Sequence, residues 1–343
     1  MTSVVKRPSL GPRVRGLRIK ELPRDKLIAI AYANTLDELL NTLKTIYEIT
    51  LDRLTKENIR ELRGELIKIY YLDKVRSVYL GSDRDAKEVV LSSLKFFEYE
   101  NIRNIAVAIK AGKNPEDFVF WAPLEFTRRR HIVAGLLGAK NLEDMRERLR
   151  QLKHPAYKAF ELAARYGEDK LSIFIDRQWI EDFSKATIAK KDRSFQVFTE
   201  DLKEYFNVLL ALRSRLWGLS EEVGELVVGK PTPMVISAAR DPPTRFLENA
   251  TSVPWGRILV DMVAEMPTLE NIAIAMDNIY PAYVRKLADI YMVKFSEFSL
   301  GALAARLEYM RAEVMAVVRA ASLIAEGVSL EKRRKIFEAL ARV

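Results

Sequence analysis

One motif occurs three times in this 343-residue chain, and the repetition constrains its fold more than any other feature. The copies span residues 98–116, 204–222 and 313–331, so they lie 106 and 109 residues apart. In each copy a glutamate begins the motif, a glycine follows 14 residues later, and a second glutamate follows 18 residues after the first. These positions are Glu98, Gly112 and Glu116, then Glu204, Gly218 and Glu222, then Glu313, Gly327 and Glu331. Fixed positions that recur in register indicate a chain built from three related repeats.

The motif has the pattern of a helix, a corner and the start of a second helix. Apolar residues recur at spacings of three and four ahead of each glycine, which places them on one buried helical face. They are Ile102, Ile105 and Ala106 in the first copy, Val208, Ala211 and Leu212 in the second, and Val317, Ala320 and Ala321 in the third. The glycine suits the left-handed residue that closes a helix. Asn101 and Asn207 precede this face and are expected to shape the corner, whereas the third copy has Ala316.

The residues that follow each glycine predict the start of the next helix. Two positions after the glycines stand Asn114, Ser220 and Ser329, which are residue types that cap a helix N-terminus. The second glutamate of each motif would then lie in the first helical turn, where a negative charge is favourable. Residues 35–38 and 141–144 also resemble helix-start capping sequences.

Helical periodicity dominates the rest of the chain, and strand-like alternation is confined to residues 118–121 and 235–237. The amphipathic stretches cover residues 37–47, 56–71, 141–152, 199–216 and 303–325. We therefore predict an all-α protein. Its predicted parts are an arm at 1–26 and helical repeats at 27–124, 125–236 and 237–343, with clustered prolines such as Pro231, Pro233, Pro242 and Pro243 marking the joints.

The sequence offers few groups for catalysis or metal binding. It has no cysteine and two histidines, His131 and His154, which are too few for a zinc site and are expected on the surface or in loops. Residues 224–230 match the first seven positions of a phosphate-binding loop, but Pro231 stands where that loop needs serine or threonine for magnesium. We predict a non-catalytic protein with no cofactor and no metal site.

Basic residues are concentrated at the N-terminus. Residues 1–26 hold eight basic and two acidic residues and so account for +6 of the net charge of +9. With their prolines and glycines they predict a flexible arm, which contacts phosphates, anionic lipid or an acidic protein face, or has no partner. The candidate membrane contacts are Lys6, Arg7, Arg13, Arg15 and Arg18.

The composition also bears on where the protein is found. No segment approaches the roughly 20 apolar residues of a membrane-spanning helix, and basic residues interrupt the N-terminus where a secretory signal would be apolar. The chain is therefore expected inside the cell. Abundant lysine, glutamate and arginine without cysteine are typical of a thermophilic or simply an intracellular source.

The order and spacing of these features resemble the C-type subunit of archaeal A-type and V-type ATP synthases, which is similar to the d-type subunit of vacuolar ATPases. The resemblance rests on the three motif copies, on residues 32–40 with Tyr47, and on residues 307–334. It covers the chain from about residue 27 to the C-terminus. It implies a funnel of three similar helical domains around a pseudo-threefold axis.

The resemblance also implies a mechanical function. Such a protein sits on the membrane rotor ring, accepts the end of the central shaft, whose subunits are of D and F type, and passes torque between them. It would lie peripherally on the cytoplasmic face of the membrane, with no nucleic acid or small-molecule substrate. The resemblance leaves the basic arm at 1–26 unexplained, and a contact of this arm with the membrane or the ring is expected from its charge alone. Glu98, Glu204 and Glu313 would either pair with neighbouring basic residues or face the central cavity.

Two other functions remain open from the sequence. A helical-repeat scaffold could bind nucleic acid through the basic arm and through the cluster at 128–130, although basic clusters there and at 332–335 are more typical of helix surfaces. An enzyme could bind ATP through residues 224–230, and that activity would depend on Lys230.

Overall fold

Helices form where the sequence supplies both capping side chains and an apolar stripe. The computed structural model describes residues 8–19, 21–331, 333–334 and 337, and all the secondary structure within them is helical, so the predicted all-α fold is confirmed. The two predicted caps are present: Thr35 Oγ1 accepts a hydrogen bond from the Glu38 N–H (3.1 Å) and Asn141 Oδ1 accepts one from the Asp144 N–H (2.8 Å).

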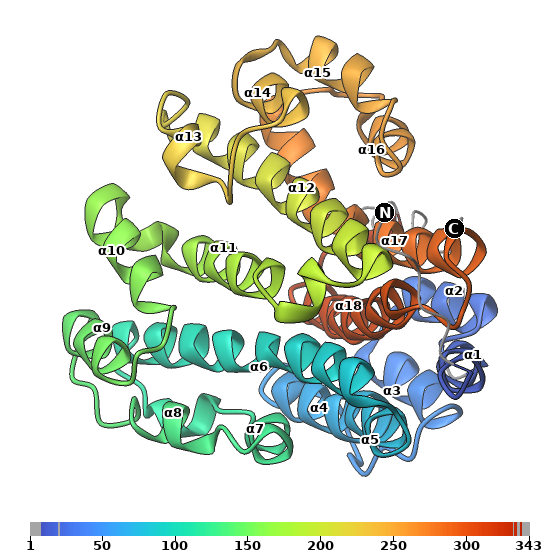
Figure 1. Ribbon diagram of the computed structural model, residues 1–343. Helices are drawn as coiled ribbons and strands as arrows, with labels where there is room; N and C mark the ends of the chain where they lie inside the picture. Colours follow the sequence, from blue (N-terminus) through green and yellow to red (C-terminus); the bar gives the residue numbers. More distant parts are fainter. Residues whose placement is uncertain (1–7, 20, 332, 335–336, 338–343) are drawn as a thin grey trace.

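The chain divides into three helix groups, each ending in a long helix, α6, α12 or α18, and the third group has a second long helix, α17 (Figure 1). The first group is α1 (Gly11–Ile19), α2 (Arg24–Tyr32), α3 (Leu36–Lys44), α4 (Ile59–Leu66), the π-helical η1 (Ile67–Leu72), α5 (Asp73–Leu80) and α6 (Arg84–Lys110). The second is η2 (Pro115–Phe118), α7 (Trp121–Thr127), α8 (Arg130–Ala134), α9 (Leu142–Gln151), α10 (Tyr157–Tyr166), η3 (Glu168–Lys170), α11 (Leu171–Ser184), η4 (Thr187–Lys190) and α12 (Arg193–Leu216). The third is α13 (Val223–Leu226), α14 (Pro233–Arg240), α15 (Pro243–Ala250), α16 (Gly256–Val263), α17 (Leu269–Lys294) and α18 (Leu300–Ala325).

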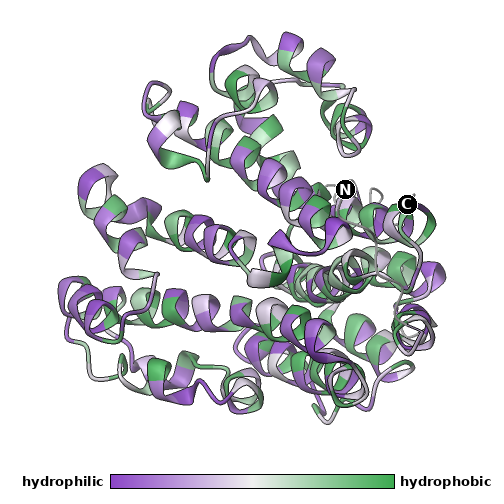
Figure 2. Cartoon of the chain, viewed as in Figure 1, coloured by the Kyte–Doolittle hydropathy of each residue, from purple (hydrophilic) through white to green (hydrophobic). Residues whose placement is uncertain are grey.

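Helix α18 lies at the centre of the core. Every residue from 300 to 314 is buried, and the helix packs against α17, α12, α6 and α4. Its many alanines allow these neighbours to approach closely, as expected of a helix that is covered on all sides. The outer helices are buried on one side, and Figure 2 shows both hydrophobic and hydrophilic residues along most of them. The predicted apolar face of all three motifs is buried, which confirms that part of the prediction.

The N-terminal segment differs from its prediction. Residues 8–19 do not form a flexible arm, because α1 packs on the core through Val14 and Leu17, and Leu10 in the turn before it is buried as well. These apolar residues recur at helical spacing between the basic ones, so a single helix can be buried on one side and charged on the other. Residues 1–7 lie outside the described part of the chain.

Two of the prolines predicted to mark the joints between the repeats lie elsewhere in the structure. Pro233 and Pro243 do not lie in joints but begin α14 and α15, because the first helical position has no need of a backbone N–H donor. The predicted boundaries after residues 124 and 236 fall inside α7 and α14, so joints in the loops before these helices fit the chain better. The two strand-like runs, 118–121 and 235–237, contain no strand.

Candidate functional site

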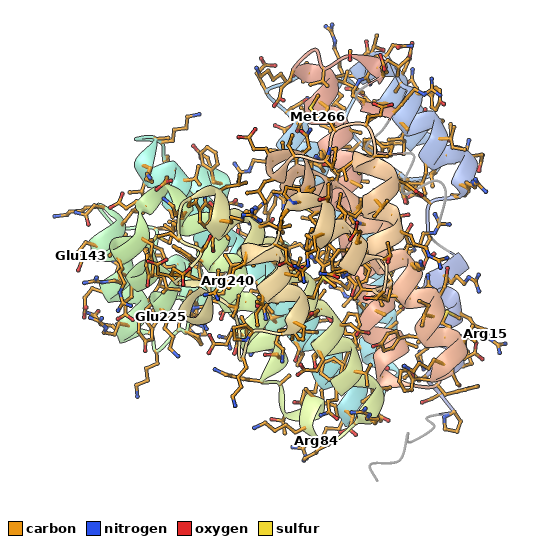
Figure 3. All side chains as sticks on the ribbon, turned by 90° about the horizontal axis from the view of Figure 1, so that it is seen from above. Arg15, Arg84, Glu143, Glu225, Arg240 and Met266 are labelled. Atoms are coloured by element: carbon orange, nitrogen blue, oxygen red, sulfur yellow. The ribbon has the colours of Figure 1, made fainter. Side chains whose placement is uncertain are left out.

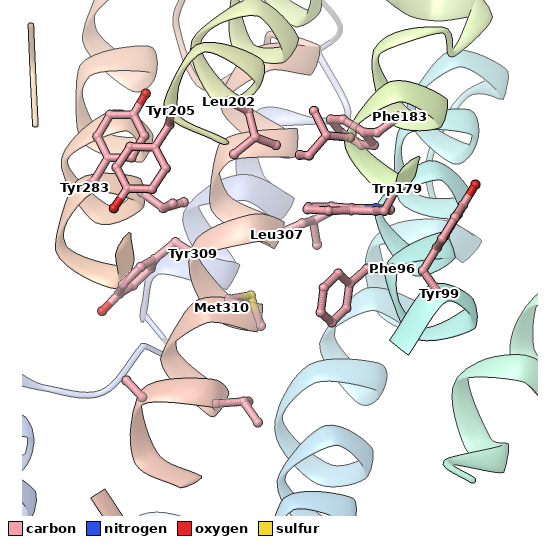
Figure 4. Packing of buried hydrophobic residues seen from close by; sticks show 14 of the residues in the cluster. Phe96, Tyr99, Trp179, Phe183, Leu202, Tyr205, Tyr283, Leu307, Tyr309 and Met310 are labelled. Carbon is pink, nitrogen blue, oxygen red and sulfur yellow. The ribbon is translucent and has the colours of Figure 1, made fainter. Parts of the chain in front are cut away.

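A cavity lies between the long helices of the three helix groups. It has a volume of about 440 Å³, is lined by residues of α6, α11, α12, α17 and α18, and is partly open to solvent. Its apolar lining includes Phe96, Trp179, Tyr205, Phe206, Leu209 and Tyr280. Figure 4 shows Phe96 and Trp179 pointing from α6 and α11 toward α18. Because each helix group contributes to the lining, the cavity is a property of the whole chain and of no single repeat.

Arg311 of α18 links the aromatic and the charged parts of the lining. Its guanidinium lies 3.7 Å from the centre of the Phe96 ring, and its Nε donates to Glu308 (2.9 Å). Burial lowers the pKa of Arg311, but Glu308 more than offsets this, so the pKa is raised above its ordinary value. The arginine is therefore a fixed charge that holds α18 against α6.

Ion pairs connect successive helix groups around the cavity. Arg103 of α6 donates to Asp176 of α11 (2.9 Å), and Arg213 of α12 donates to Asp277 of α17. Glu100 accepts from Arg103 (3.3 Å) as well. The Asp176 carboxylate raises the pKa of Arg103. Paired charges of this kind fix the positions of neighbouring helices relative to one another. The cavity lining therefore has an apolar part, made by the aromatic side chains, and a charged part, made by these ion pairs.

A second depression adjoins the cavity, and Val318 and Ser322 line both of them. It has a volume of about 550 Å³ and lies beside α4 and η2. Its lining holds the carboxylates of Glu57 and Glu326 and a larger set of basic and aromatic side chains, which are Lys56, Arg60, Arg63, Lys113, Phe118 and Phe120. The Arg60 and Arg63 guanidinium groups each lie 4.8 Å from a phenylalanine ring centre, that of Phe118 and that of Phe120 respectively.

The cavity lining combines charged and aromatic side chains. Its polar groups are mainly arginines and the carboxylates that pair with them, set among aromatic side chains, and arginine and aromatic residues are enriched at protein interfaces. In the described residues, no group of three or more histidine, aspartate or glutamate side chains is placed to hold a metal ion. Within the same residues, no helix is long and apolar enough to cross a membrane.

Comparison with known families decides the relationship. A family model described as ATP synthase (C/AC39) subunit matches residues 10–336. The chain belongs to the C/AC39 family. No curated protein sequence matches it.

The corners of this C/AC39 protein follow the predicted glycine geometry. Gly112, Gly218 and Gly327 have φ angles of 62°, 74° and 69°, in the left-handed region. The residue after each glycine donates its N–H to the carbonyl five residues earlier, from Lys113 to Ala108 (2.9 Å), Leu219 to Ser214 (2.8 Å) and Val328 to Leu323 (3.0 Å). All three corners therefore end their helices in the same way.

The predicted asparagines bind the chain beyond each corner. Asn101 accepts from the Phe120 N–H (2.7 Å) and donates to the Phe120 carbonyl (3.1 Å). Asn207 makes the same two bonds with Val228, at 2.8 and 2.9 Å. Each side chain satisfies both backbone groups of a buried residue about 20 positions later.

The three motif glutamates have different environments, and none of them lines the cavity. Glu98 is buried and accepts from Arg129 (2.9 Å) and His154 (2.6 Å). Glu204 accepts from Thr232 (2.7 Å). Glu313 is fully buried and accepts from Tyr70, from Tyr309 (2.8 Å) and from the Leu22 N–H (3.1 Å). Of the two interpretations left open, pairing with a basic residue therefore holds for Glu98.

His154 lies in a loop, which is one of the two places expected for the histidines, but it is not on the surface. It is 2% exposed, because its Nε2 contacts Glu98 and its Nδ1 accepts from the Ala156 N–H (3.2 Å). His131 is exposed as expected.

The second glutamates of the motifs agree only in part with their prediction. Glu116 lies in the first turn of η2, and the Asn114 side chain caps that turn. Glu331 is helical and follows Ser329 closely. Glu222 lies outside its helix, since the turn after Gly218 continues until α13 begins at Val223, and Ser220 makes no cap there. The second corner is therefore followed by a longer turn than the prediction assumed.

The predicted membrane contacts lie on α1 where the structure describes them. Arg13 donates to the Ser77 carbonyl (3.3 Å), Arg15 pairs with Glu297, and Arg18 is exposed. Figure 3 shows Arg15 on the opposite side of the molecule from Glu143 and Glu225. Lys6 and Arg7 lie outside the described residues.

The features behind the alternative functions are engaged in internal contacts only in part, since Lys230, Arg128 and Arg130 are exposed. In the phosphate-loop-like segment, the Val228 N–H donates to Asn207 and the Leu226 carbonyl accepts from Arg177 (2.8 Å). In the basic clusters, Arg129 pairs with Glu98, and Arg333 is buried and donates to the Ala33 carbonyl. Lys332 and Lys335 lie outside the described residues.

Sequence reasoning missed the charged residues around the cavity, above all Arg103, Asp176, Asp277 and Arg319. One signal was available. Asp277 is the single charged residue between Glu270 and Arg285, in an otherwise apolar helical stretch. A lone carboxylate in such a stretch has to find a partner or a cavity.

Proposed function

We propose that this chain is a non-catalytic central-stalk subunit of a rotary A-type or V-type ATP synthase, coupling the membrane rotor ring to the central shaft. Membership of the C/AC39 family supports a place in such a complex. The observation that carries the proposal furthest is the cavity between α6, α11, α12, α17 and α18, since it offers another subunit a site lined by paired helices. Paired helices resist bending better than loops do, which suits a part that transmits torque.

In this proposal the three repeats, with their joints in the loops before α7 and α14, form similar domains around a pseudo-threefold axis and together make a funnel. Two observations support it. The ion pairs Arg103–Asp176 and Arg213–Asp277 link each helix group to the next, and α18 of the last group packs back against α4 and α6 of the first. A chain that closes on itself in this way can enclose a central cavity.

The proposed partners are the shaft subunits of D and F type on one side and the proteolipid ring on the other. The chain would lie peripherally on the cytoplasmic face of the membrane, held by protein contacts, and would bind neither nucleic acid nor a small-molecule substrate. Its function in ion-driven ATP synthesis or ATP-driven pumping would be mechanical.

Reconstitution tests the proposal. Vesicles carrying the membrane sector of the cognate ATP synthase are combined with its soluble sector and shaft, with or without this chain, and ATP hydrolysis and ion uptake are measured separately. We expect hydrolysis in both mixtures but ion uptake only when the chain is present. Equal ion uptake without the chain, or failure of the chain to bind the purified shaft and ring, contradicts the proposal.

A further inference from the structure

Arg319 differs from the other arginines around the cavity because it has no partner among the described residues. Arg103 and Arg311 are paired with Asp176 and Glu308, whereas no described residue makes a hydrogen bond or an ion pair with Arg319. The Arg319 side chain is half-buried on α18 and lines the cavity. Burial lowers its pKa, and the more distant Asp277 opposes this only in part. A half-buried cation without a counter-charge is costly to the free protein.

Arg60, which lines the adjoining depression, is also half-buried and has no ion-pair partner among the described residues. It packs on Phe118 and Phe120, and no carboxylate lies within ion-pair distance of it in the described chain. Burial lowers the pKa of Arg60, with Asp117 opposing and Arg63 adding to the effect. Because Val318 and Ser322 line both hollows, Arg60 and Arg319 belong to one continuous surface beside the C-terminal half of α18.

Two buried polar atoms in the cavity lining are also unsatisfied. Trp179 Nε1 has no acceptor and Asn278 Oδ1 has no donor in the described structure, and their side chains are 1% and 9% exposed. Both atoms are shielded by their neighbours even from water, so a segment in the cavity does not reach them. Leu209, Met315 and Ala316 supply apolar contact area beside them.

We infer that the cavity and its adjoining depression receive an acidic polypeptide segment, whose carboxylates pair with Arg319 and Arg60. This inference rests on the proposed function and adds the chemistry of the partner: the tip of the central shaft that enters the cavity carries acidic side chains. An unpaired, partly buried cation destabilises the free protein. In the complex the same cation pairs with a carboxylate of the partner, so partners that have a carboxylate at this position bind more tightly than those that lack one. The shaft tip is thereby distinguished from basic or neutral helices.

Binding measurements with charge-neutral variants test this inference. The probe is the purified shaft complex of the cognate ATP synthase, and the chain is compared as wild type, Arg319→Gln, Arg60→Gln and the control Arg84→Gln. Arg84 is exposed at the start of α6, about 28 Å along the helix axis from Arg103, and at the edge of the molecule in Figure 3. The control removes the same charge from a site away from the cavity.

We expect Arg319→Gln and Arg60→Gln each to raise the Kd for the shaft by about 30-fold or more, mainly through faster dissociation, while Arg84→Gln leaves it within about twofold. Wild-type binding should weaken as salt is added, and less steeply in the Arg319 variant. The melting temperature of Arg319→Gln should equal or exceed that of the wild type, because the substitution removes an uncompensated charge. Thermal unfolding thus separates a binding effect from a folding effect.

The outcomes separate the inference from the proposed function. If the wild type binds the shaft and both cavity variants bind equally well, the inference is wrong while the adaptor function stands. Equal weakening by all three variants also overturns it, because the effect would then come from net charge alone. If the wild type does not bind the shaft at all, the proposed function fails, and the inference fails with it.

Discussion

The His154 Nε2 atom lies 2.6 Å from Glu98 Oε1, and both side chains are almost fully buried. The contact joins the loop after α9 to the middle of α6, 56 positions apart in the chain. With Arg129, it makes Glu98 the one motif glutamate that is paired with basic residues. The stability of this corner should therefore depend on the charge of a single carboxylate.

Acid should weaken the protein through Glu98. Burial raises the pKa of this carboxyl, but hydrogen bonds from His154 and Arg129 outweigh burial, and the pKa falls below its ordinary value of 4.5. The charged form thus stabilises the fold above about pH 4.5, and this contribution is lost as the pH falls through the lowered value. Glu98→Gln should cost about 3 kcal/mol of unfolding free energy at pH 7 and should remove this part of the acid response.

Glu204→Gln is the matched control for that change. Glu204 occupies the same motif position but is half-buried and accepts a hydrogen bond from Thr232, so its substitution should cost about 1 kcal/mol. Urea unfolding of both variants between pH 3 and 7 measures the difference. Equal losses at every pH would show that the ion pairs of Glu98 contribute nothing of their own.

Glu21 should respond to pH in the opposite direction. Burial, helped by the nearby Glu313 and opposed by Arg306, raises the pKa of Glu21 to about 7 from an ordinary 4.5. Between these values the unfolded chain has lost the proton and the folded chain still holds it, so stability decreases as the pH rises. The stability of the wild type relative to Glu21→Gln should fall by about 3 kcal/mol from pH 4.5 to pH 8. Parallel unfolding curves for the two proteins would refute this account.

Asn101→Ala and Asn207→Ala should be equivalent. Each leaves both backbone groups of a buried residue without partners, at Phe120 and at Val228, and should cost about 2 kcal/mol. The two sites share no partner, so the double variant should lose nearly the sum. Asn104→Ala is the control, since its half-buried side chain donates one hydrogen bond, to the Phe118 carbonyl. Chemical denaturation of the four proteins measures these differences, and a strongly non-additive double variant would contradict the independence of the corners.

Glycine substitutions should separate two kinds of constraint. Gly218→Ala meets no neighbouring atom but forces a side chain into the left-handed region, at a cost of about 1–2 kcal/mol. Gly301→Ala places a Cβ against the Ser194 carbonyl oxygen where α18 and α12 meet, and should cost about 3 kcal/mol or more. Gly64→Ala, inside α4 with open space around it, should stabilise by about 0.5–1 kcal/mol. Thermal unfolding gives the order, and an equal effect of all three substitutions would rule out this explanation.

Local rules account for what could be predicted from the sequence. The glycine corners, the caps at Thr35 and Asn141 and the apolar faces of α6, α12 and α18 depend on residues within about five positions of one another. Helix caps and helical periodicity act over that range, so the all-α fold and the repeated corner could be predicted. The Glu222 prediction failed because the length of the turn after Gly218 is not set by its cap-like Ser220.

The tertiary structure alone decided which charges meet. Arg306 pairs with Glu21 across 285 positions and Tyr70 reaches Glu313 across 243, and no periodic pattern connects residues so far apart. The burial of α1 likewise depends on the surface that the rest of the chain presents to Val14 and Leu17. The sequence by itself determined helices, corners and repetition, because these arise from neighbouring residues. The cavity and its Arg319, unpaired within the described chain, arise only when helices from all three groups pack together, since a charge is paired or unpaired according to what lies beside it in space.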